Sequence, residues 1–451
     1  MKRLFLLVLV GCFMVTGMAL AQPEEVVKIT VRCRAKPPME NWRGNNFLLA
    51  AEELNADLEA AGDPRRVKVE IIQDNMDWGD YVKEFVLSYG SGEAPDIWLT
   101  GHEYISAQAE AGRIIPLDEL IGEFPVFNSV IKRLWDCTKY KGHIWGIPQD
   151  AEARPLYWNK SLLKKLGWSQ KEIAALSDKI RRGEFTLYDM LETAKEAVAK
   201  GIVPLGNGFW TRPKNGPDFT AFYYVFGGKT MDPVTGKLIF DKAAGLKYYK
   251  FFYDAAQNYG SMGCLGLGWS ESWHPGVSTG KVLFWVGGTW QWAEWAEIYL
   301  KDLGGEDYLW KNVGFGLIPA AEKGGNPDTL THPLTYLINS QCKYPDLALA
   351  LIAKVTNYGP NTRHAISSTH LGILKDQTKY KFYKTSRLLS EALYMLDYTT
   401  FLPNSPYWGP YSTLTYEALA AVVGGEFTPE KAVDFVVEGL QRELGDKVII
   451  R

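Results

Sequence analysis

Apolar residues recur with two alternating periods over the first hundred residues of the chain. A β-rich run at Val26–Val31, the alternating positions of Val67–Ile71 and the short apolar run Pro95–Leu99 are typical of strands. Between them, apolar side chains at Phe47–Leu58 and Trp78–Tyr89 follow helical spacing. This order of strand, helix, strand, helix, strand predicts a parallel sheet with helical crossovers.

Longer helical patterns follow in the remainder of the chain. We expect helices over Lys160–Gly167, Thr186–Lys200 and Asp346–Tyr358. The last helix should begin at Thr428, with Thr as the N-cap and Pro429 in the first turn. The 451 residues are too many for one ordinary core and contain no low-complexity linker. Two lobes, built by a chain that crosses between them more than once, explain both features.

The N-terminus has the pattern of an export signal. Lys2 and Arg3 precede the apolar stretch Leu4–Met18, and Ala19–Ala21 has the small-x-small form of a cleavage site. We therefore expect export to the periplasm or another extracytoplasmic space, with a soluble mature chain that begins at Gln22.

Two other readings of this segment remain open. The stretch could be an uncleaved anchor helix, since 18 apolar or small residues run from Leu4 to Ala21. Leu9–Cys12 also resembles a lipoprotein box, although the apolar stretch before Cys12 is very short. No other apolar segment is long enough to span a membrane.

The amino-acid composition argues against several kinds of binding partner and favours a ligand that stacks on aromatic rings. The net charge is −3 and no run of basic residues occurs, which argues against nucleic acid or an anionic membrane as a partner. Sixteen tryptophans are an excess that ring-stacking surfaces for a ligand would explain. The cysteines are scattered, and His364 and His370 have no Cys or acid at metal-ligand spacing, so we expect no metal and no cofactor.

Four segments follow one another along the chain: Gly90–Ile97 with Ala111–Leu117, Gly146–Pro148 with Leu156–Leu162, Gly280–Trp290, and Pro406–Trp408 leading to the terminal helix. In this order they resemble the extracellular solute-binding proteins of carbohydrate ABC importers, a family that includes the maltose-binding protein group. The resemblance extends from about Val26 to Leu444.

This resemblance implies a two-lobed α/β fold of the class II periplasmic-binding type, with mixed sheets covered by helices and a hinge between the lobes. We expect residues 22–150 and 334–375 in the N-terminal lobe, and 151–333 and 376–451 in the C-terminal lobe. The implied function is capture of a sugar, such as an oligosaccharide, by a monomer that delivers it to a membrane permease. No catalytic residue is expected.

The resemblance also implies ligand-binding residues. Trp290 and Trp408 lie in segments similar to those that supply stacking tryptophans in the family. Glu152 stands where the family has a carboxylate that bonds sugar hydroxyls, with Asp150 as the neighbouring candidate. Each has a plain alternative: the tryptophans could be core or rim residues, and the acids could be solvated loop residues.

The resemblance breaks at one point that bears on the ligand. Thr100 stands where the maltose-binding proteins have a stacking tryptophan, which argues against maltose itself, and Glu103 stands where they have a binding aspartate. Trp42 and Trp210 could supply a replacement platform, and Trp292 is a further candidate. For these three, packing in the core or a loop is as good an explanation.

Two other functions compete with sugar capture. A secreted carbohydrate-active hydrolase or lyase would also have a leader and many tryptophans, but it needs a pair of carboxylates flanking the scissile bond. We find no recognisable catalytic motif. A binding protein for another solute, such as a polyamine or a metal chelate, is the third possibility.

Overall fold

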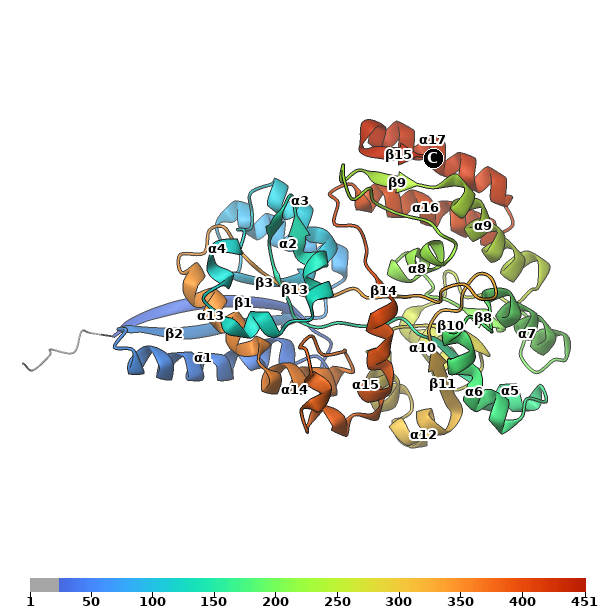
Figure 1. Ribbon diagram of the computed structural model, residues 1–451, viewed down its shortest axis with the longest axis horizontal. Helices are drawn as coiled ribbons and strands as arrows, with labels where there is room; N and C mark the ends of the chain where they lie inside the picture. Colours follow the sequence, from blue (N-terminus) through green and yellow to red (C-terminus); the bar gives the residue numbers. More distant parts are fainter. Residues whose placement is uncertain (1–23) are drawn as a thin grey trace, which may run out of the picture.

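The computed structural model describes residues 24–451, so the predicted export signal lies outside the described residues. The described chain forms two lobes, each built around its own sheet, with several extended segments running between them (Figure 1). The predicted two-lobed α/β fold with mixed sheets is confirmed.

The first lobe contains a five-stranded sheet in the order β2-β1-β3-β13-β6. Its strands are β1 (Glu25–Arg34), β2 (Arg65–Asp74), β3 (Ile97–Gly101), β6 (Ile147–Pro148) and β13 (Leu334–Ile338). β1 pairs in parallel with both β2 and β3, as the sequence pattern predicts. β13 arrives from a distant part of the chain and pairs antiparallel with β3 and β6.

Helices cover both faces of this sheet, which explains why β3 is buried along its whole length. Ile97 and Leu99 pack on the face covered by α1 (Trp42–Ala60) and α13 (Pro345–Thr356). Trp98, which points to the opposite face, stacks on Phe85 of α2 (Trp78–Ser91) with ring centroids 4.0 Å apart. This alternation follows from the two-residue period of a strand.

The second lobe contains a four-stranded sheet in the order β11-β7-β10-β8. Its strands are β7 (Leu156–Asn159), β8 (Phe209–Trp210), β10 (Phe284–Val286) and β11 (Val313–Gly316). The helices around it are α5 (Lys160–Lys165), α6 (Gln170–Arg181), α7 (Leu187–Ala199), α8 (Pro217–Val225), α9 (Lys242–Tyr253), α10 (His274–Ser278), α11 (Gln291–Glu294), α12 (Gly305–Asn312), α15 (Arg387–Ala392), α16 (Trp408–Val423) and α17 (Pro429–Leu444).

The C-terminal helices pack on the second lobe rather than the first (Figure 1). α16 and α17 contact each other and α9, and β15 (Val448–Ile450) pairs in parallel with β9 (Leu238–Phe240). The Thr428 hydroxyl caps α17 by accepting a hydrogen bond from the backbone N–H of Lys431, as expected for an N-cap.

The remaining elements are short, apart from one full-length helix. They are η1 (His102–Tyr104), α3 (Ile105–Glu110), α4 (Asp118–Ile121), η2 (Pro125–Ser129), η3 (Lys132–Thr138), β4 (Lys139–Tyr140), β5 (His143–Ile144), η4 (Asp254–Asn258), η5 (Trp269–Trp273), η6 (Trp295–Tyr299), η7 (Lys301–Leu303), β12 (Thr329–Leu330), α14 (Tyr358–Ser368), η8 (Gln377–Lys379), η9 (Tyr383–Thr385), η10 (Leu393–Tyr398), β14 (Thr399–Thr400) and η11 (Gly445–Lys447).

The segment predicted as one helix, Asp346 to Tyr358, spans parts of two helices in the structure. The pattern from Asp346 to Tyr358 suggests one helix, whereas α13 ends at Thr356 and α14 begins at Tyr358. Asn357 lies between them with an extended backbone, at ψ 160°, which interrupts the helical hydrogen bonds. The other predicted strands and helices are present, with ends that differ by a few residues.

Two general features of the described chain bear on function. Within residues 24–451, no helix is both long and apolar enough to cross a membrane. The four cysteines in this part of the chain, Cys33, Cys137, Cys264 and Cys342, are free thiols.

Candidate functional site

An extended segment at the junction of the two lobes carries two of the candidate binding residues, Asp150 and Glu152. Ala151 exchanges backbone hydrogen bonds with Leu371, and β12 pairs in parallel with β14. Side chains project alternately from an extended backbone, so Asp150, Glu152 and Arg154 share one side of their segment. This spacing brings three charged groups into the junction, and all three are buried.

Asp150 lies in a buried polar cluster. One of its carboxylate oxygens accepts a hydrogen bond from Arg43 at 3.0 Å and lies 3.1 Å from Nε2 of His364. Its other oxygen accepts from the backbone N–H of Leu334. Burial alone would raise the pKa of Asp150, but the charges of His370 and Arg43 and the bond to His364 hold it well below its usual range. These contacts use both oxygens, so Asp150 fixes the junction in this conformation.

Glu152 belongs to a second chain of charges. The Arg154 guanidinium is paired with Glu152 and with Asp218 of α8, the latter at 2.8 Å. Nε of Arg212 lies 4.0 Å from the same Asp218 carboxylate. Burial raises the pKa of Glu152 to about 7, although the Arg154 charge acts in the opposite direction. Because this pKa is close to neutral, a small change in the neighbouring charges alters the fraction of Glu152 that is ionised.

Trp290 lies beside these charges, at the start of α11. Its ring folds over the backbone of Gly288, where a Cβ would come within 1.8 Å of a ring atom, so only glycine fits there. The Arg154 guanidinium carbon is 4.8 Å from the ring centroid, and the His370 ring lies nearly parallel to the indole at 5.7 Å. The ring remains partly exposed. Trp290 and the segment with Asp150 and Glu152, far apart in the sequence, thus meet at one junction.

Glu103 approaches the same junction from the first lobe. It follows the end of β3, and its carboxylate lies 2.7 Å from Nε2 of His332. His332 in turn has Nδ1 4.0 Å from the Glu152 carboxylate. Although burial opposes the effect, the His332 charge lowers the pKa of Glu103 to about 2.

Thr100 and Trp42 occupy different surroundings. Thr100 is fully buried in β3, and its hydroxyl has no hydrogen-bond partner within residues 24–451. Trp42 is half-buried at the start of α1, with the Arg363 guanidinium 4.7 Å from its ring centroid. Neither is in contact with the Glu152–Arg154–Trp290 group among the interactions that the structure shows.

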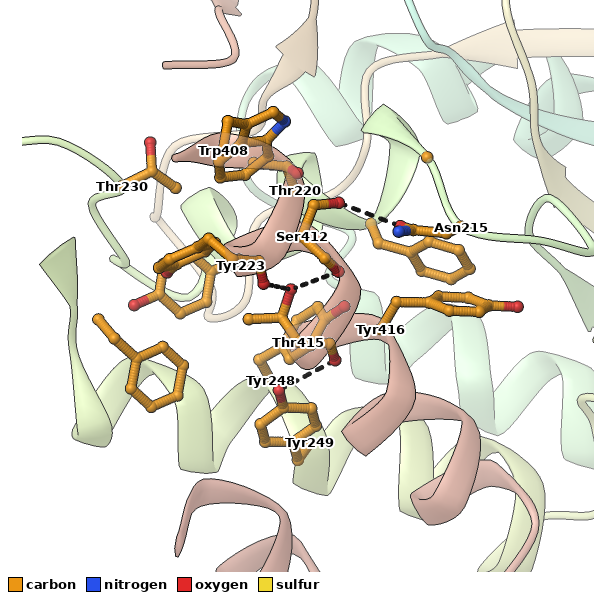
Figure 2. Close-up of a pocket in the computed structure, with 14 residues that line it drawn as sticks. Asn215, Thr220, Tyr223, Thr230, Tyr248, Tyr249, Trp408, Ser412, Thr415 and Tyr416 are labelled. Atoms are coloured by element: carbon orange, nitrogen blue, oxygen red, sulfur yellow. Dashed lines mark hydrogen bonds between the residues drawn. The ribbon is translucent and has the colours of Figure 1, made fainter. Parts of the chain in front are cut away.

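Trp408 lines a pocket of the second lobe (Figure 2). It begins α16 and stacks on Tyr411 with ring centroids 5.1 Å apart. The pocket is lined by aromatic rings and small polar groups from α8, the loop before it, α9 and α16, among them Asn215, Tyr223, Ser412, Thr415 and Tyr416. Ring faces with hydroxyl and amide groups are the chemistry that a sugar ring needs, but the cavity is about 30 Å³, which is the size of a water molecule. A sugar ring enters only if the pocket widens.

Trp210 and Trp292 are buried in the core of the second lobe. Nε1 of Trp210 donates to the backbone carbonyl of Gly206 at 2.7 Å. Trp292 is 1% exposed and packs against Tyr157 and Phe315. Because their rings are covered by protein, we leave both out of the proposed site.

Sequence reasoning missed Arg154, His332 and Asp218. Arg154 has a detectable signal, since it continues the alternation that begins at Asp150 and Glu152. His332 and Asp218 have none, because their importance comes from distant residues that the fold brings beside them.

Comparisons with known proteins agree with this architecture. A family model described as bacterial extracellular solute-binding protein matches residues 50–360. A maltotriose-binding protein of Pyrococcus abyssi is 26% identical over 164 residues, which are 36% of this chain and 32% of that protein. The aligned stretch therefore spans about a third of that relative's length.

Solved structures match over nearly the whole chain. The GacH receptor of Streptomyces glaucescens, studied unliganded and with acarbose, has a TM-score of 0.73 at 18% identity and covers 93% of this chain and 98% of its own. Maltose-bound T. maritima MalE3 has a TM-score of 0.69 at 18% identity and covers 93% and 100%. At such low identity these matches show the fold.

Proposed function

This chain belongs to the bacterial extracellular solute-binding protein family, whose model matches more than half of it, and we propose that it captures an oligosaccharide between its lobes. The observation that carries the proposal is the meeting of Trp290 with buried charged groups at the junction of two lobes of this family's fold. An apolar ring covers the face of a pyranose, and carboxylates and guanidinium groups bond its hydroxyl rim.

Relatives support an oligosaccharide built of glucose-type units as the ligand class. The aligned Pyrococcus protein is a maltotriose-binding protein, and the two solved structures described above were studied with acarbose and with maltose. Thr100, in place of a stacking tryptophan, removes one platform that the maltose-binding group uses. We therefore propose that the ligand differs from maltose in length or linkage.

We assign the ligand contacts to two groups of residues. Trp290, Glu152 and Glu103 form the junction group, and Arg154 joins them as a further contact. Trp408 supplies a platform in the aromatic pocket of the second lobe. Trp42 is a secondary candidate, and Thr100 is left out because it is fully buried in β3. Asp150 supports the site through Arg43 and His364.

Binding of this kind needs no bond to be made or broken. Ligand shifts the lobes toward a closed arrangement only through contacts that it makes in that arrangement and lacks in the open one. The hydrolase or lyase alternative has no support from the family, which consists of binding proteins.

A thermal-shift screen over mono- and oligosaccharides tests the proposal. A ligand at a hundredfold excess over its Kd stabilises the folded protein by ~2.7 kcal/mol, which is readily measured. We expect an oligosaccharide to raise the melting temperature more than its constituent monosaccharide does. Equal, negligible shifts across the panel would argue against a carbohydrate ligand.

Delivery to an ABC permease and export of the chain complete the proposal. We propose that the mature protein begins at Gln22 and acts outside the cytoplasm as a monomer, with lobes that comprise residues 22–150 with 334–375 and 151–333 with 376–451. Mass spectrometry of the exported protein tests the cleavage site. A lipid-modified N-terminus at Cys12 would replace the soluble form and leave the transport role intact.

A further inference from the structure

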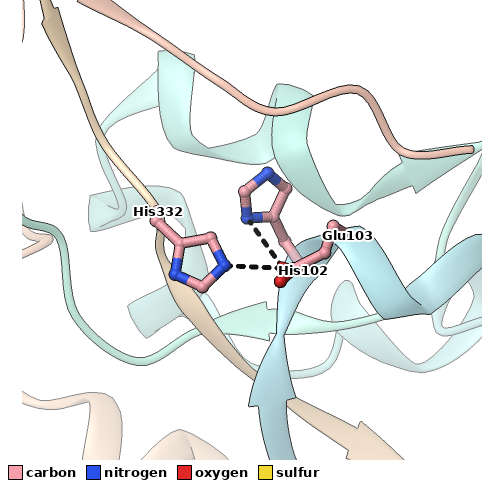
Figure 3. A group of neighbouring side chains, drawn as sticks. All are labelled: His102, Glu103 and His332. Carbon is pink, nitrogen blue, oxygen red and sulfur yellow. Dashed lines mark hydrogen bonds and ion pairs between the residues drawn. The ribbon is translucent and has the colours of Figure 1, made fainter. Parts of the chain in front are cut away.

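His102, Glu103 and His332 form a compact group of metal-ligand type at the edge of the first lobe. His102 and Glu103 belong to η1, directly after β3, whereas His332 lies on the extended segment between β12 and β13. Figure 3 shows the Glu103 carboxylate between the two imidazole rings. The three candidate ligand atoms all lie within 4.8 Å of one another.

His102 presents an unused nitrogen to this group. The side chain is fully buried, and its Nε2 lies 3.3 Å from the backbone carbonyl oxygen of Leu402. This contact assigns the proton to Nε2 and leaves a lone pair on Nδ1. Nδ1 has no hydrogen-bond partner in the described chain and lies 4.0 Å from the Glu103 carboxylate. A buried, unsatisfied acceptor is costly, and a bound cation would satisfy it.

His332 directs both ring nitrogens toward carboxylates. Its Nε2 faces the Glu103 carboxylate at 2.7 Å, while Nδ1 lies 4.0 Å from the Glu152 carboxylate, which is too far for a hydrogen bond. Metal-ligating histidines usually direct the second nitrogen to a carboxylate or a carbonyl, which fixes the ring. His102 has such a contact with Leu402, and Glu152 is the carboxylate nearest to Nδ1 of His332. A bound metal ion replaces the proton between Nε2 of His332 and Glu103.

The Glu103 side chain packs closely against the backbone of Gly101. Its carboxylate folds back over Gly101, where a Cβ would lie 2.4 Å from the oxygen that faces both histidines. The side chains of Glu103 and His332 are 12% and 11% exposed, so the group is reachable from solvent.

We propose that His102, Glu103 and His332 bind a divalent transition metal of the Zn²⁺ class through Nδ1, a carboxylate oxygen and Nε2. Two imidazoles and one carboxylate form a set that suits zinc and leaves the fourth tetrahedral position open. Ligand atoms ~2.1 Å from a tetrahedral ion lie ~3.4 Å from one another, so separations of up to 4.8 Å must shorten by up to ~1.4 Å, or ~0.7 Å for each of the two atoms. The proposal does not depend on a sugar ligand.

A second cluster of similar composition, Asp150 with His364 and His370, carries no such proposal. The Arg43 guanidinium donates to Asp150 at 3.0 Å and lies 3.2 Å from Nε2 of His370. A fixed positive charge already occupies the position that a cation would need.

Titration of the chelator-treated protein with ZnCl₂ in a calorimeter tests the site. We expect one tight site per chain, and at least tenfold weaker binding in each of His102→Gln, Glu103→Gln and His332→Gln. Co²⁺ should give the intense visible absorption of a tetrahedral site, which each variant loses. His143→Gln is the matched control, because His143 is an exposed histidine beside an acid, Asp118, 3.2 Å away.

Three results would overturn the proposal. The wild-type protein binds no Zn²⁺, the three variants bind Zn²⁺ as tightly as the wild type does, or binding is lost only in His143→Gln or Cys342→Ser. Should His102→Gln unfold, the partly exposed Glu103→Gln and His332→Gln variants decide the matter. Their melting curves without metal establish that they are folded.

Discussion

The guanidinium carbon of Arg154 lies 4.8 Å from the centroid of the Trp290 ring. This cation–π contact places a positive charge at the ring that we propose as a sugar platform. Arg154 also pairs with Glu152 and Asp218, so one side chain connects the platform to two buried carboxylates. A sugar that stacks on Trp290 must therefore share the ring with Arg154 or displace it.

Trp290→Ala and Trp408→Ala should each weaken oligosaccharide binding tenfold or more, which corresponds to about 1.4 kcal/mol. Both rings are only partly buried, so the unliganded melting temperature should change little. Calorimetric titration and thermal melting of each variant check this prediction.

Trp292→Ala supplies the control for those two variants. Its ring is buried in the core, and truncation there costs about 3–5 kcal/mol of stability. A Trp290 or Trp408 variant that melts as low as Trp292→Ala, while its folded fraction binds sugar normally, would show that the residue belongs to the core.

Arg154→Met should destabilise the protein by about 3–5 kcal/mol, because it leaves Glu152 and Asp218 buried without their cation. Adding Glu152→Gln and Asp218→Asn removes those charges and should recover part of the loss. Denaturant unfolding measures the loss of stability in the single variant and its recovery in the triple variant. Arg181→Met, at an exposed pair with Asp178, should change stability by less than about 1 kcal/mol. A similar loss in both arginine variants would contradict the buried-network account.

Lys36→Met should let the unliganded lobes separate. Lys36 follows β1 of the first lobe and pairs with Glu294 of α11 in the second, where Glu294 is almost fully buried. Loss of this pair leaves a buried carboxylate without its cation, which favours an opening that rehydrates it. Small-angle X-ray scattering should show a larger radius of gyration.

Lys214→Met is the matched comparison for that experiment. Lys214 and Asp77 also join the two lobes, at 3.6 Å, but both side chains are 64% exposed. Exposed pairs contribute little, so its scattering should match that of the wild type. Identical scattering from Lys36→Met would refute the bridging role of Lys36.

Asp328→Asn should stabilise the protein at pH 8 and leave stability nearly unchanged at pH 4. Burial raises the pKa of Asp328 to about 7, whereas the unfolded chain has a pKa near the ordinary ~3.9. Between these values the folded state retains a proton that the unfolded state releases, so stability falls as pH rises through this window. The gain at pH 8 is at most ~4 kcal/mol.

Thermal melting as a function of pH measures the effect. Asp302→Asn, at an exposed position, serves as the control and should give no pH-dependent difference from the wild type. An Asp328→Asn difference that is as large at pH 4 as at pH 8 would show that the variant acts through packing.

The sequence predicts the strands and helices of the first lobe well because the apolar pattern of each element depends only on residues within that element. Alternation in Val67–Ile71 and helical spacing in Trp78–Tyr89 each come from one element that buries one face. The break at Asn357 was missed because apolar residues continue on both sides of it, and the interruption depends on a single backbone angle.

The candidate site is predicted less completely because its chemistry is assembled from distant segments. Trp290 and Glu152 are found through their motifs, whereas Trp210 and Trp292 have similar local surroundings in sequence and yet pack into the core. The expectation of no metal site considered only histidines close in sequence. His102 and His332 are 230 positions apart, and only the pairing of β13 with β3 brings them together.

Isothermal titration of the purified protein with a series of oligosaccharides that covers maltooligosaccharides and glucose oligomers of other linkages, followed by chromatography of the recovered sugar, tests the central claim most directly. The account predicts saturable one-to-one binding of at least one oligosaccharide, with micromolar or tighter affinity, and recovery of that sugar unchanged. Turnover of the sugar, or the absence of binding to every oligosaccharide in the series, would contradict it.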